Sequence, residues 1–552
     1  MKRTKPFMTR TTESPTNRFA FAVLLLILLG AAAVRLINLG VPSLWVDEVN
    51  HVYAGQSLMN GEEPRFPSGN LNERALLYSW MVAISFKLFG MNEFAARLPS
   101  VAFGLLAIVV VFFFARSLFN TRIALLSAFL LAFSHNAIGW SRTSRMYTLF
   151  QLLFLLGVWL FWRGFERRQD VAEASAWYRI LDVDLRWIVA SLGVFALSFH
   201  VHQLTALFAP SLWAYSAVLF VIAGVQRGWG EAVRLRYGFV SLGAVLLGLL
   251  ALTLLGLKEF LEYAIHFRPA WARYNLVTDT HYYFWFLAKS SNFPIAALFL
   301  IGALQTVTRL DKHAFFALCN FAVPAFMLSF VFSYRVHNYI FHVYPFYVML
   351  AAYALDNLFE AEYGILKEKL RGAVFRLSDR WLRWLAYAII VGWLPLTVWF
   401  RYALKLPYVV PTGMNGAVDH LNWRAAVDWL RENGAADGVI VSTLPLTIHY
   451  YLGHVEYNLN MANLDETLDW RNGEARVDYY SGVPAITSVE ELKAVIQKHE
   501  VGYIVVDIYR FERDRYVPQT IARYIDEHLQ RVWEDPYKTV RIYRWQRTPS
   551  DK

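Results

Sequence analysis

Long apolar segments between residues 19 and 404 constrain the fold of this 552-residue chain more than any other feature. A helix needs about 20 mostly apolar residues to cross the hydrocarbon core of a bilayer. About eleven segments meet this requirement: 19–39, 98–115, 123–140, 146–162, 187–204, 206–225, 237–257, 283–307, 314–332, 339–355 and 384–404. A shorter apolar segment, 75–90, carries Trp80 and Lys87, which suit the lipid headgroup region. We therefore expect a polytopic α-helical membrane domain with one interfacial helix at 75–90.

Composition separates this membrane part from a water-exposed end. The chain is 57% hydrophobic and 17% charged, against about 25% charged residues in ordinary soluble domains, which excludes a wholly soluble protein. Residues 408–552 have ordinary soluble composition. Their patterns predict an α/β domain with helices at 423–433, 489–499 and 519–529 and strands at 438–442, 502–506 and 539–545. The predicted parts are therefore residues 1–18, a membrane domain at 19–407 with a long outer loop at 40–97, and the α/β domain.

The distribution of Lys and Arg predicts the orientation. Lys and Arg are more frequent in the loops that are predicted to lie on the same side of the membrane as the N-terminus, as is typical of cytoplasmic loops. This bias places residues 1–18 in the cytoplasm, the α/β domain outside it, and the chain in the plasma (inner) membrane. A cleaved signal peptide is an alternative for the N-terminus, since small residues at 31–33 follow an apolar start.

Charge and cysteine content exclude other classes of function. The net charge of +10 is what the cytoplasmic loops of a membrane protein accumulate, so no nucleic-acid partner is expected. Cys319 is the single cysteine and lies in an apolar segment. The chain can therefore form neither an internal disulfide nor a metal site made of cysteines.

The outer loop 40–97 carries a pair of adjacent carboxylates, Asp47 and Glu48. Their surroundings have helical periodicity and predict a helix that lies flat on the membrane surface. Adjacent helical residues point about 100° apart, so only one of the two can face a cavity while the other faces water or caps the helix. The alternative is that both are solvated charges favoured by the helix dipole.

Basic and polar residues gather at the same predicted face of the membrane. Arg142 and Arg145 lie in one outer connection, His266 lies in another, and Arg335 lies in a third. Such groups bind a lipid phosphate through charged hydrogen bonds, or else they anchor the protein among the headgroups. We expect Arg142 to be such an anchor.

Several of these motifs resemble the polyprenyl-phosphate-dependent glycosyltransferases of the GT-C class. The runs DEVNHVYAGQSLMNGEEPRF and NERALLYSWMVAISFKLFGMNEFAARLPSVAFGLL are similar to the start of glycosyltransferase family 39, the protein O-mannosyltransferase and aminoarabinose lipid A transferase group. Glu73 and Arg74 take the positions of that family's Glu-Lys, although its two prolines are replaced by Ala75 and Leu76. The run RTSRMYTLF resembles the family's second outer motif, with Arg145 where Asp is common, and YRVHNYIFHVYPFYVMLAAYAL resembles its late motif.

The resemblance implies an inverting transferase that moves a sugar from a polyprenyl-phosphate donor to a hydroxyl of a lipid, glycan or protein. Asp47 matches the family's catalytic base and Glu48 its orienting neighbour. The resemblance further implies that Arg335, with Arg74 and Arg145, binds the donor phosphate. A divalent metal ion is the implied cofactor.

The metal ligands that the resemblance implies are Glu73 and His266, with a hydrogen-bonded interfacial histidine as the alternative for His266. A transporter or flippase of lipid-linked sugars is the alternative function. It would predict paired halves with interrupted helices, and the sequence has no internal repeat. An ion carrier would need ionisable residues at mid-membrane depth, where the chain has few. The α/β domain is expected to dock the acceptor or to pack over the site.

Overall fold

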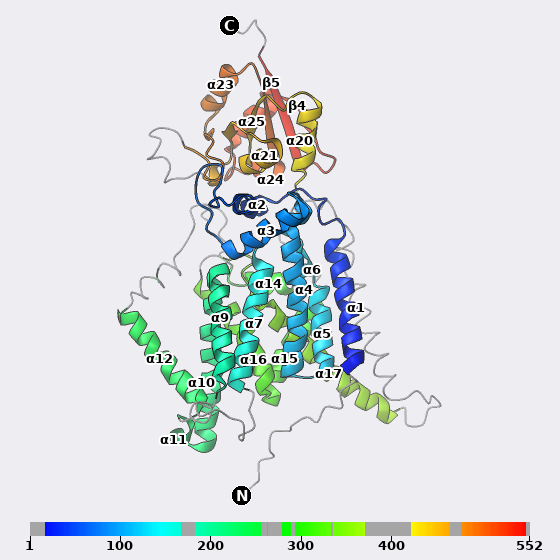
Figure 1. The fold of residues 1–552 in the computed structure, drawn as a ribbon, viewed down its shortest axis with the longest axis vertical. Coiled ribbons are helices and arrows are strands. Elements are labelled where there is room, and N and C mark those ends of the chain that lie inside the picture. Colours follow the sequence, from blue (N-terminus) through cyan, green and yellow to red (C-terminus); the bar gives the residue numbers. More distant parts are fainter. Residues whose placement is uncertain are drawn as a thin grey trace.

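The computed structural model shows a helical bundle with a sheet-containing domain at one end (Figure 1). The structure describes residues 17–166, 183–233, 235–254, 262, 279–288, 293–332, 335–369, 421–463 and 476–547. The first helix begins at the opposite end of the bundle from the sheet domain (Figure 1).

Twelve α-helices form the described part of the bundle. They are α1 (Asn17–Leu36), α4 (Glu93–Leu118), α5 (Thr121–Ala132), α6 (His135–Ser141), α7 (Tyr147–Glu166), α9 (Leu185–Val201), α10 (Phe208–Arg227), α12 (Arg236–Leu254), α14 (Tyr282–Ala288), α15 (Phe293–Arg309), α16 (Lys312–Phe326) and α17 (Tyr344–Lys369). Short elements connect some of them: η1 (Gln203–Leu207), α11 (Trp229–Ala232), the π-helical turn η3 (Met327–Val331) and η4 (Phe341–Val343).

Within the described residues, five helical segments are long and apolar enough to cross a membrane, and seven if each bent pair of helices counts as one span. The predicted segment 384–404 lies outside the described residues. The predicted single helix at 123–140 is instead broken: α5 and α6 meet at an angle of 59°. At the break, the Arg35 guanidinium donates to the carbonyl oxygen of Ala132 over 2.7 Å, so the end of α5 is stabilised by a side chain from α1.

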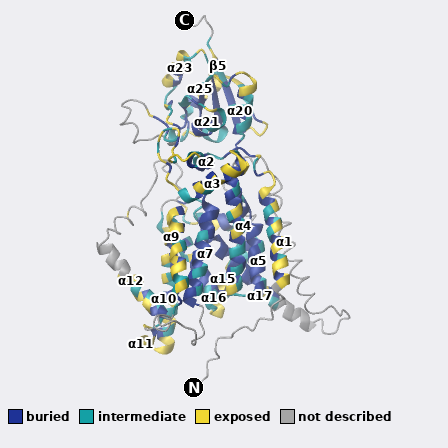
Figure 2. Cartoon of the chain, in the orientation of Figure 1, coloured by how far each residue is buried: buried dark blue, intermediate teal, exposed yellow. Residues whose placement is uncertain are grey.

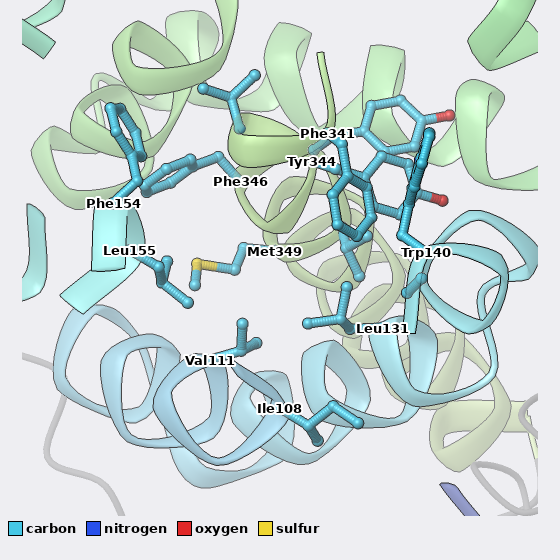
Figure 3. Packing of buried hydrophobic residues seen from close by; sticks show 14 of the residues in the cluster. Ile108, Val111, Leu131, Trp140, Phe154, Leu155, Phe341, Tyr344, Phe346 and Met349 are labelled. Atoms are coloured by element: carbon cyan, nitrogen blue, oxygen red, sulfur yellow. The ribbon is translucent and has the colours of Figure 1, made fainter. Parts of the chain in front are cut away.

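The core of the bundle lies where α4, α5, α7 and α17 meet. Figure 3 shows Val111, Leu131, Leu155 and Met349 converging from these four helices. The outward faces of α1 and α9 expose large apolar side chains instead, as Figure 2 shows by their yellow colour. A helix that buries one face and exposes apolar residues on the other is typical of the lipid-facing rim of a membrane domain.

Two short helices lie between the bundle and the sheet domain (Figure 1): α2 (Val46–Met59) and α3 (Leu76–Phe89). The 14 residues of α3 extend about 21 Å at 1.5 Å per residue, which is less than the hydrocarbon thickness of about 30 Å. Trp80 on this helix is exposed. The length and position of α3 support the predicted interfacial helix.

In its described residues, the C-terminal domain contains a mixed five-stranded sheet of order β2-β1-β3-β5-β4. Its strands are β1 (Val439–Ser442), β2 (Tyr457–Asn458), β3 (Val501–Asp507), β4 (Gln530–Glu534) and β5 (Val540–Gln546). Its helices are α20 (Trp423–Glu432), α21 (Pro445–Leu452), α23 (Val489–Lys498), α24 (Ile508–Phe511) and α25 (Gln519–His528). Strand β1 is parallel to β2 and β3, whereas β5 is antiparallel to both of its neighbours.

Both faces of the sheet are covered. Tyr503 and Val505 of β3 point into one apolar cluster with Trp423, while Ile504 and Val506 point into the other with Ile521. This alternation follows from the period of two in a strand. The six predicted elements are all present, and the structure adds α21, α24, β2 and β4.

The sheet domain docks on the outer loop through a few partly buried polar contacts. The Tyr451 hydroxyl accepts from the backbone N of Leu44 over 2.7 Å and donates to Glu93 Oε1 over 2.9 Å. Arg424 forms an ion pair with the same Glu93 carboxylate. Tyr53 of α2 is hydrogen-bonded to His449 Nδ1 over 2.6 Å. These contacts place the C-terminal domain directly above the predicted catalytic loop.

Candidate active site

The two adjacent carboxylates at the start of α2 have different environments. The side chain of Glu48 is fully buried and forms a two-point ion pair with Arg97, with Nε to Oε1 and Nη2 to Oε2 both at 2.8 Å. Glu48 also accepts from the backbone N of Trp45 over 2.8 Å and of Ser144 over 2.6 Å. The interpretation of both residues as solvated charges is therefore wrong for Glu48, because its oxygens are used to join α2, α4 and the connection after α6.

Arg97 completes this buried connection. Its Nη atoms donate to the carbonyl oxygens of Leu39, Pro42 and Ser43 over 2.8 to 2.9 Å. Arg97 lies in the second of the two runs that resemble family 39, and the resemblance gave it no role. A charged residue inside an apolar helix is the signal that could have identified it, since such residues are rarely buried without a partner.

The carboxylate of Asp47 keeps capacity for a further partner. Its side chain is 39% exposed, and its Oδ2 lies 3.5 Å from Nη2 of Arg145. Nη1 of Arg145 donates to the backbone carbonyl of Asp47 over 3.0 Å. The position of Asp47 in the first turn of α2 also favours a negative charge. The structure thus brings together two of the predicted site residues, one acidic and one basic.

Arg145 also contacts Tyr147 and Ser100. The guanidinium lies 5.6 Å from the centre of the Tyr147 ring, and the Arg145 carbonyl accepts from Ser100 Oγ over 3.1 Å. Burial lowers the pKa of Arg145, but the charge of Asp47 and the contacts with Tyr147 outweigh this effect and raise the pKa overall. Within the described part of the chain, Nε of Arg145 has no hydrogen-bond partner. The guanidinium therefore stays charged and keeps a donor unused.

The two other arginines predicted to bind phosphate lie in different surroundings. Arg74 is exposed in the turn before α3, and its positive charge lowers the pKa of Tyr480, as does that of Arg145. Arg335 is buried, and its Nε and Nη2 donate to the carbonyl oxygen of Ser329 over 2.9 and 2.6 Å. Arg74 is thus exposed to solvent, whereas two donors of Arg335 are used by the Ser329 carbonyl of η3.

Arg142 differs from the prediction. It is buried rather than placed among headgroups, and its Nη1 donates to the carbonyl oxygens of Val34, Arg35 and Ile37. The expected interfacial anchor is therefore wrong. Arg142 instead satisfies the carbonyl groups at the C-terminal end of α1, which a helix end leaves without partners.

The structure describes only one of the two predicted metal ligands. Glu73 is exposed in the turn before α3, and His266 lies outside the described residues. In the ranges that the structure describes, no three His, Cys, Asp or Glu side chains form a group that could hold a metal ion. The mechanism proposed for this chain uses protein side chains alone.

His51 is a residue that the sequence analysis did not single out. It follows Asp47 by four residues on α2, so it lies on the same face of the helix. Its ring is buried, with Nδ1 3.0 Å from Ser79 Oγ, while Nε2 has no hydrogen-bond partner among the described residues. Burial, with the charge of Arg145, lowers the pKa of His51 well below its usual value. The site therefore contains a neutral imidazole with one unused nitrogen.

Comparison with known proteins supports the resemblance seen in the sequence. Residues 73–254 match the family model described as dolichyl-phosphate-mannose-protein mannosyltransferase. An uncharacterized protein of Aquifex aeolicus is 23% identical over 396 residues, which cover 70% of this chain and 72% of that protein. The family match includes Arg74, Arg97 and Arg145 of the site described above.

Solved structures share the fold over almost the whole chain. ArnT of Cupriavidus metallidurans, bound to undecaprenyl phosphate, is 16% identical with a TM-score of 0.55 over 96% of this chain and 98% of that one. The oligosaccharyltransferase AglB of Archaeoglobus fulgidus, in complex with an inhibitory peptide and a dolichol-phosphate, is 13% identical with a TM-score of 0.57 over 97% and 75% of the two chains. This chain is therefore a multi-pass membrane protein with the fold of the GT-C glycosyltransferases, as its sequence predicts.

Proposed function

We propose that this chain is an inverting glycosyltransferase that moves a sugar from a polyprenyl-phosphate donor to a hydroxyl acceptor at the outer face of the membrane. The enzyme class is that of the matched family and of the structural relatives, which include ArnT bound to undecaprenyl phosphate and AglB in complex with a dolichol-phosphate. The observation that carries the proposal is the half-exposed Asp47 carboxylate beside the Arg145 guanidinium. A base next to an anion-binding group is what sugar transfer from a phosphate requires.

In this mechanism Asp47 accepts the proton of the acceptor hydroxyl as its oxygen attacks C1 of the sugar. The bond between C1 and the phosphate oxygen breaks, and both electrons leave with the polyprenyl phosphate. A single displacement of this kind inverts the configuration at C1. The guanidinium of Arg145, with Arg74 and Arg335, would stabilise the negative charge that grows on the phosphate.

The buried ion pair of Glu48 and Arg97 holds the start of α2 and so fixes where Asp47 points. Glu48 has no role in proton transfer in this proposal, because all its oxygens accept hydrogen bonds from the protein. A requirement for a divalent metal ion stays a prediction of the resemblance.

The proposed orientation has the N-terminus in the cytoplasm and the C-terminal domain outside the plasma membrane. The opposite positions of the start of α1 and the sheet domain support it (Figure 1). Reporter enzymes fused after residue 547 should be active only on the extracytoplasmic side. Activity in the cytoplasm would contradict both this orientation and an outer active site.

The function can be tested with the purified full-length protein in liposomes. Radiolabelled undecaprenyl-phosphate-mannose and undecaprenyl-phosphate-aminoarabinose serve as donors, with lipid and protein extracts of the cell envelope as acceptors. We expect the wild type to release undecaprenyl phosphate from one donor and to label one extract, while Asp47→Asn does neither. Glu63→Gln is the matched control, because Glu63 is an exposed carboxylate of the same loop that forms an ion pair with the exposed Arg65. No donor consumption by the wild type would overturn the proposal.

A further inference from the structure

The aromatic ring of Tyr147, the first residue of α7, packs beside the guanidinium of Arg145. The centre of the guanidinium lies 5.6 Å from the centre of the ring, within the distance of about 6 Å at which a cation is attracted to an aromatic face. Tyr147 is buried, which keeps water away from this contact. The same guanidinium contacts Asp47 of α2 through Nη1 and Nη2. Arg145 is therefore held by two partners, one anionic and one neutral and aromatic.

The side chain of Tyr147 is itself fixed by a distant part of the chain, the late motif. Asn338, in the turn before η4, donates through Nδ2 to the Tyr147 hydroxyl. The ring of His337 stacks on that of Trp140 at 5.5 Å, and the buried Trp140 packs edge-on against Tyr147 at 4.6 Å. Two adjacent residues of the late motif thus hold Tyr147, one at its hydroxyl and one through the indole of Trp140.

The late motif has further contacts with the same part of the bundle. One helical turn after Tyr147, the buried Gln151 donates through Nε2 to the carbonyl oxygen of Phe341 over 2.7 Å. The ring of Phe341 also lies beside that of Trp140 (Figure 3), with 6.3 Å between the ring centres. A substitution that removes only the hydroxyl of Tyr147 therefore leaves the late motif attached to α7, and its effect on the site can be measured separately.

The two partners of Arg145 respond differently to the proposed reaction. When Asp47 accepts the proton of the acceptor hydroxyl, its carboxylate becomes neutral and attracts the guanidinium less. Negative charge grows on the donor phosphate in the same step. The ring of Tyr147 is neutral throughout, so its attraction for the guanidinium does not depend on the proton transfer. Tyr147 is thus the partner that keeps Arg145 in place while the charge on the phosphate increases.

We propose that Tyr147 and Asn338 are positioning residues, which hold the guanidinium of Arg145 at the phosphate of a polyprenyl-phosphate lipid. This inference rests on the proposed function and adds to it a connection from the late motif to the phosphate through Arg145. A guanidinium displaced from its place would stabilise less of the charge on the leaving phosphate.

The experiment measures the dissociation constant of radiolabelled undecaprenyl phosphate for the full-length protein in bilayer nanodiscs, and turnover in the liposome assay described above. Tyr147→Phe and Asn338→Ala are each made in the wild-type chain and in the Arg145→Ala chain. Loss of one neutral hydrogen bond corresponds to roughly two- to tenfold in affinity. In the wild-type chain, we expect each variant to weaken binding and to lower turnover by about fivefold. In the Arg145→Ala chain neither should have a further effect, because residues that act through one group are not additive.

Tyr215→Phe is the matched control. Tyr215 of α10 is a buried tyrosine whose hydroxyl donates to Glu166 Oε1 over 2.7 Å. Its substitution also removes one hydroxyl from the membrane domain, but this hydroxyl has no part in holding Arg145. We expect Tyr215→Phe to change neither the dissociation constant nor the turnover.

The outcomes separate this inference from the proposed function. Unchanged binding and turnover for Tyr147→Phe in the wild-type chain would overturn the inference, and the transferase would stand. Equal effects in the wild-type and Arg145→Ala chains would overturn it as well, since Tyr147 would not act through Arg145. If the wild type binds undecaprenyl phosphate but consumes neither sugar donor, the proposed function fails, and the binding measurements still test the inference. Thermal unfolding midpoints show whether each variant is folded, and Asn338→Ala decides if Tyr147→Phe is not.

Discussion

Two carboxylates at opposite ends of the membrane domain, Glu166 and Asp47, have opposite environments. At the end away from the sheet domain, Glu166 of α7 is buried and accepts hydrogen bonds from Tyr215 over 2.7 Å, Tyr237 over 2.9 Å and Arg236 over 3.0 Å. It also forms an ion pair with Lys312. At the outer end, Asp47 is 39% exposed and has one side-chain partner at 3.5 Å in the described residues.

The difference follows from the role of each carboxylate. A buried carboxylate is tolerated only when its oxygens are fully hydrogen-bonded, since an unpaired buried charge costs several kcal/mol. The Glu166 cluster joins α7, α10, α12 and α16, and Glu48 does the same for the outer helices. A catalytic base must keep an oxygen available, which excludes such saturation. The degree of hydrogen-bond saturation therefore separates structural carboxylates from the candidate catalytic one in this protein.

The largest effect is expected from Asp47→Asn. An amide of the same size cannot accept a proton at neutral pH, and a general base contributes roughly 10²- to 10⁴-fold to the rate. Turnover of the undecaprenyl-phosphate donor should fall by at least about 100-fold, with the thermal unfolding midpoint close to that of the wild type. Near-normal turnover would show that Asp47 is not the base and would remove the functional contrast between the Asp47 and Glu166 carboxylates.

A smaller loss is expected from Arg145→Ala. A charged hydrogen bond contributes about 1.5 to 3 kcal/mol, which corresponds to roughly 10- to 150-fold in turnover. Arg145→Lys should keep part of the activity, because it keeps the charge and loses the planar fork. Arg335→Ala is the comparison, since two donors of Arg335 contact Ser329. Full activity of Arg145→Ala together with an inactive Arg335→Ala would move the phosphate site to the late motif.

Glu166→Gln and Glu48→Gln test the structural half of the comparison. Each removes one partner of a buried ion pair, a change that costs about 3 to 5 kcal/mol. Both should lower the thermal unfolding midpoint and the yield of folded protein in detergent. In the protein that does fold, Glu166→Gln should leave the donor KM unchanged. A stable Glu48→Gln variant with strongly reduced turnover would instead assign Glu48 to the chemistry.

The smallest effect concerns pH and His51. Burial lowers the pKa of His51 in the folded state, so below about pH 6.5, the usual value for histidine, the unfolded state binds a proton that the folded state does not. The contribution of His51 to stability is therefore present above that pH and is lost as the pH falls. The unfolding midpoint should decrease less between pH 7 and 5 in His51→Gln than in the wild type. Equal decreases would contradict a buried neutral imidazole.

Local pattern was sufficient for much of the fold. The period of two in β3 and the apolar faces of α20 and α25 are visible in the sequence, because a strand or helix must present apolar residues at fixed spacing to a core. The missed β4 (Gln530–Glu534) has no fully buried residue and has polar residues at three of its five positions, so its signal is weak. The break between α5 and α6 was missed for another reason, since apolar composition is the same in a straight and a bent helix.

The sequence by itself determined the class of the molecule: a membrane domain, a water-exposed α/β domain, and a pair of carboxylates in an outer loop. Only the tertiary structure decided which of the two carboxylates is buried and which is partly exposed. Glu48 accepts hydrogen bonds from Arg97 and Ser144, whereas Asp47 is partly exposed beside Arg145, although the two acidic residues are adjacent in the chain. Their roles depend on partners from distant segments, and hydrogen bonds are directional contacts that residue type and local spacing do not encode.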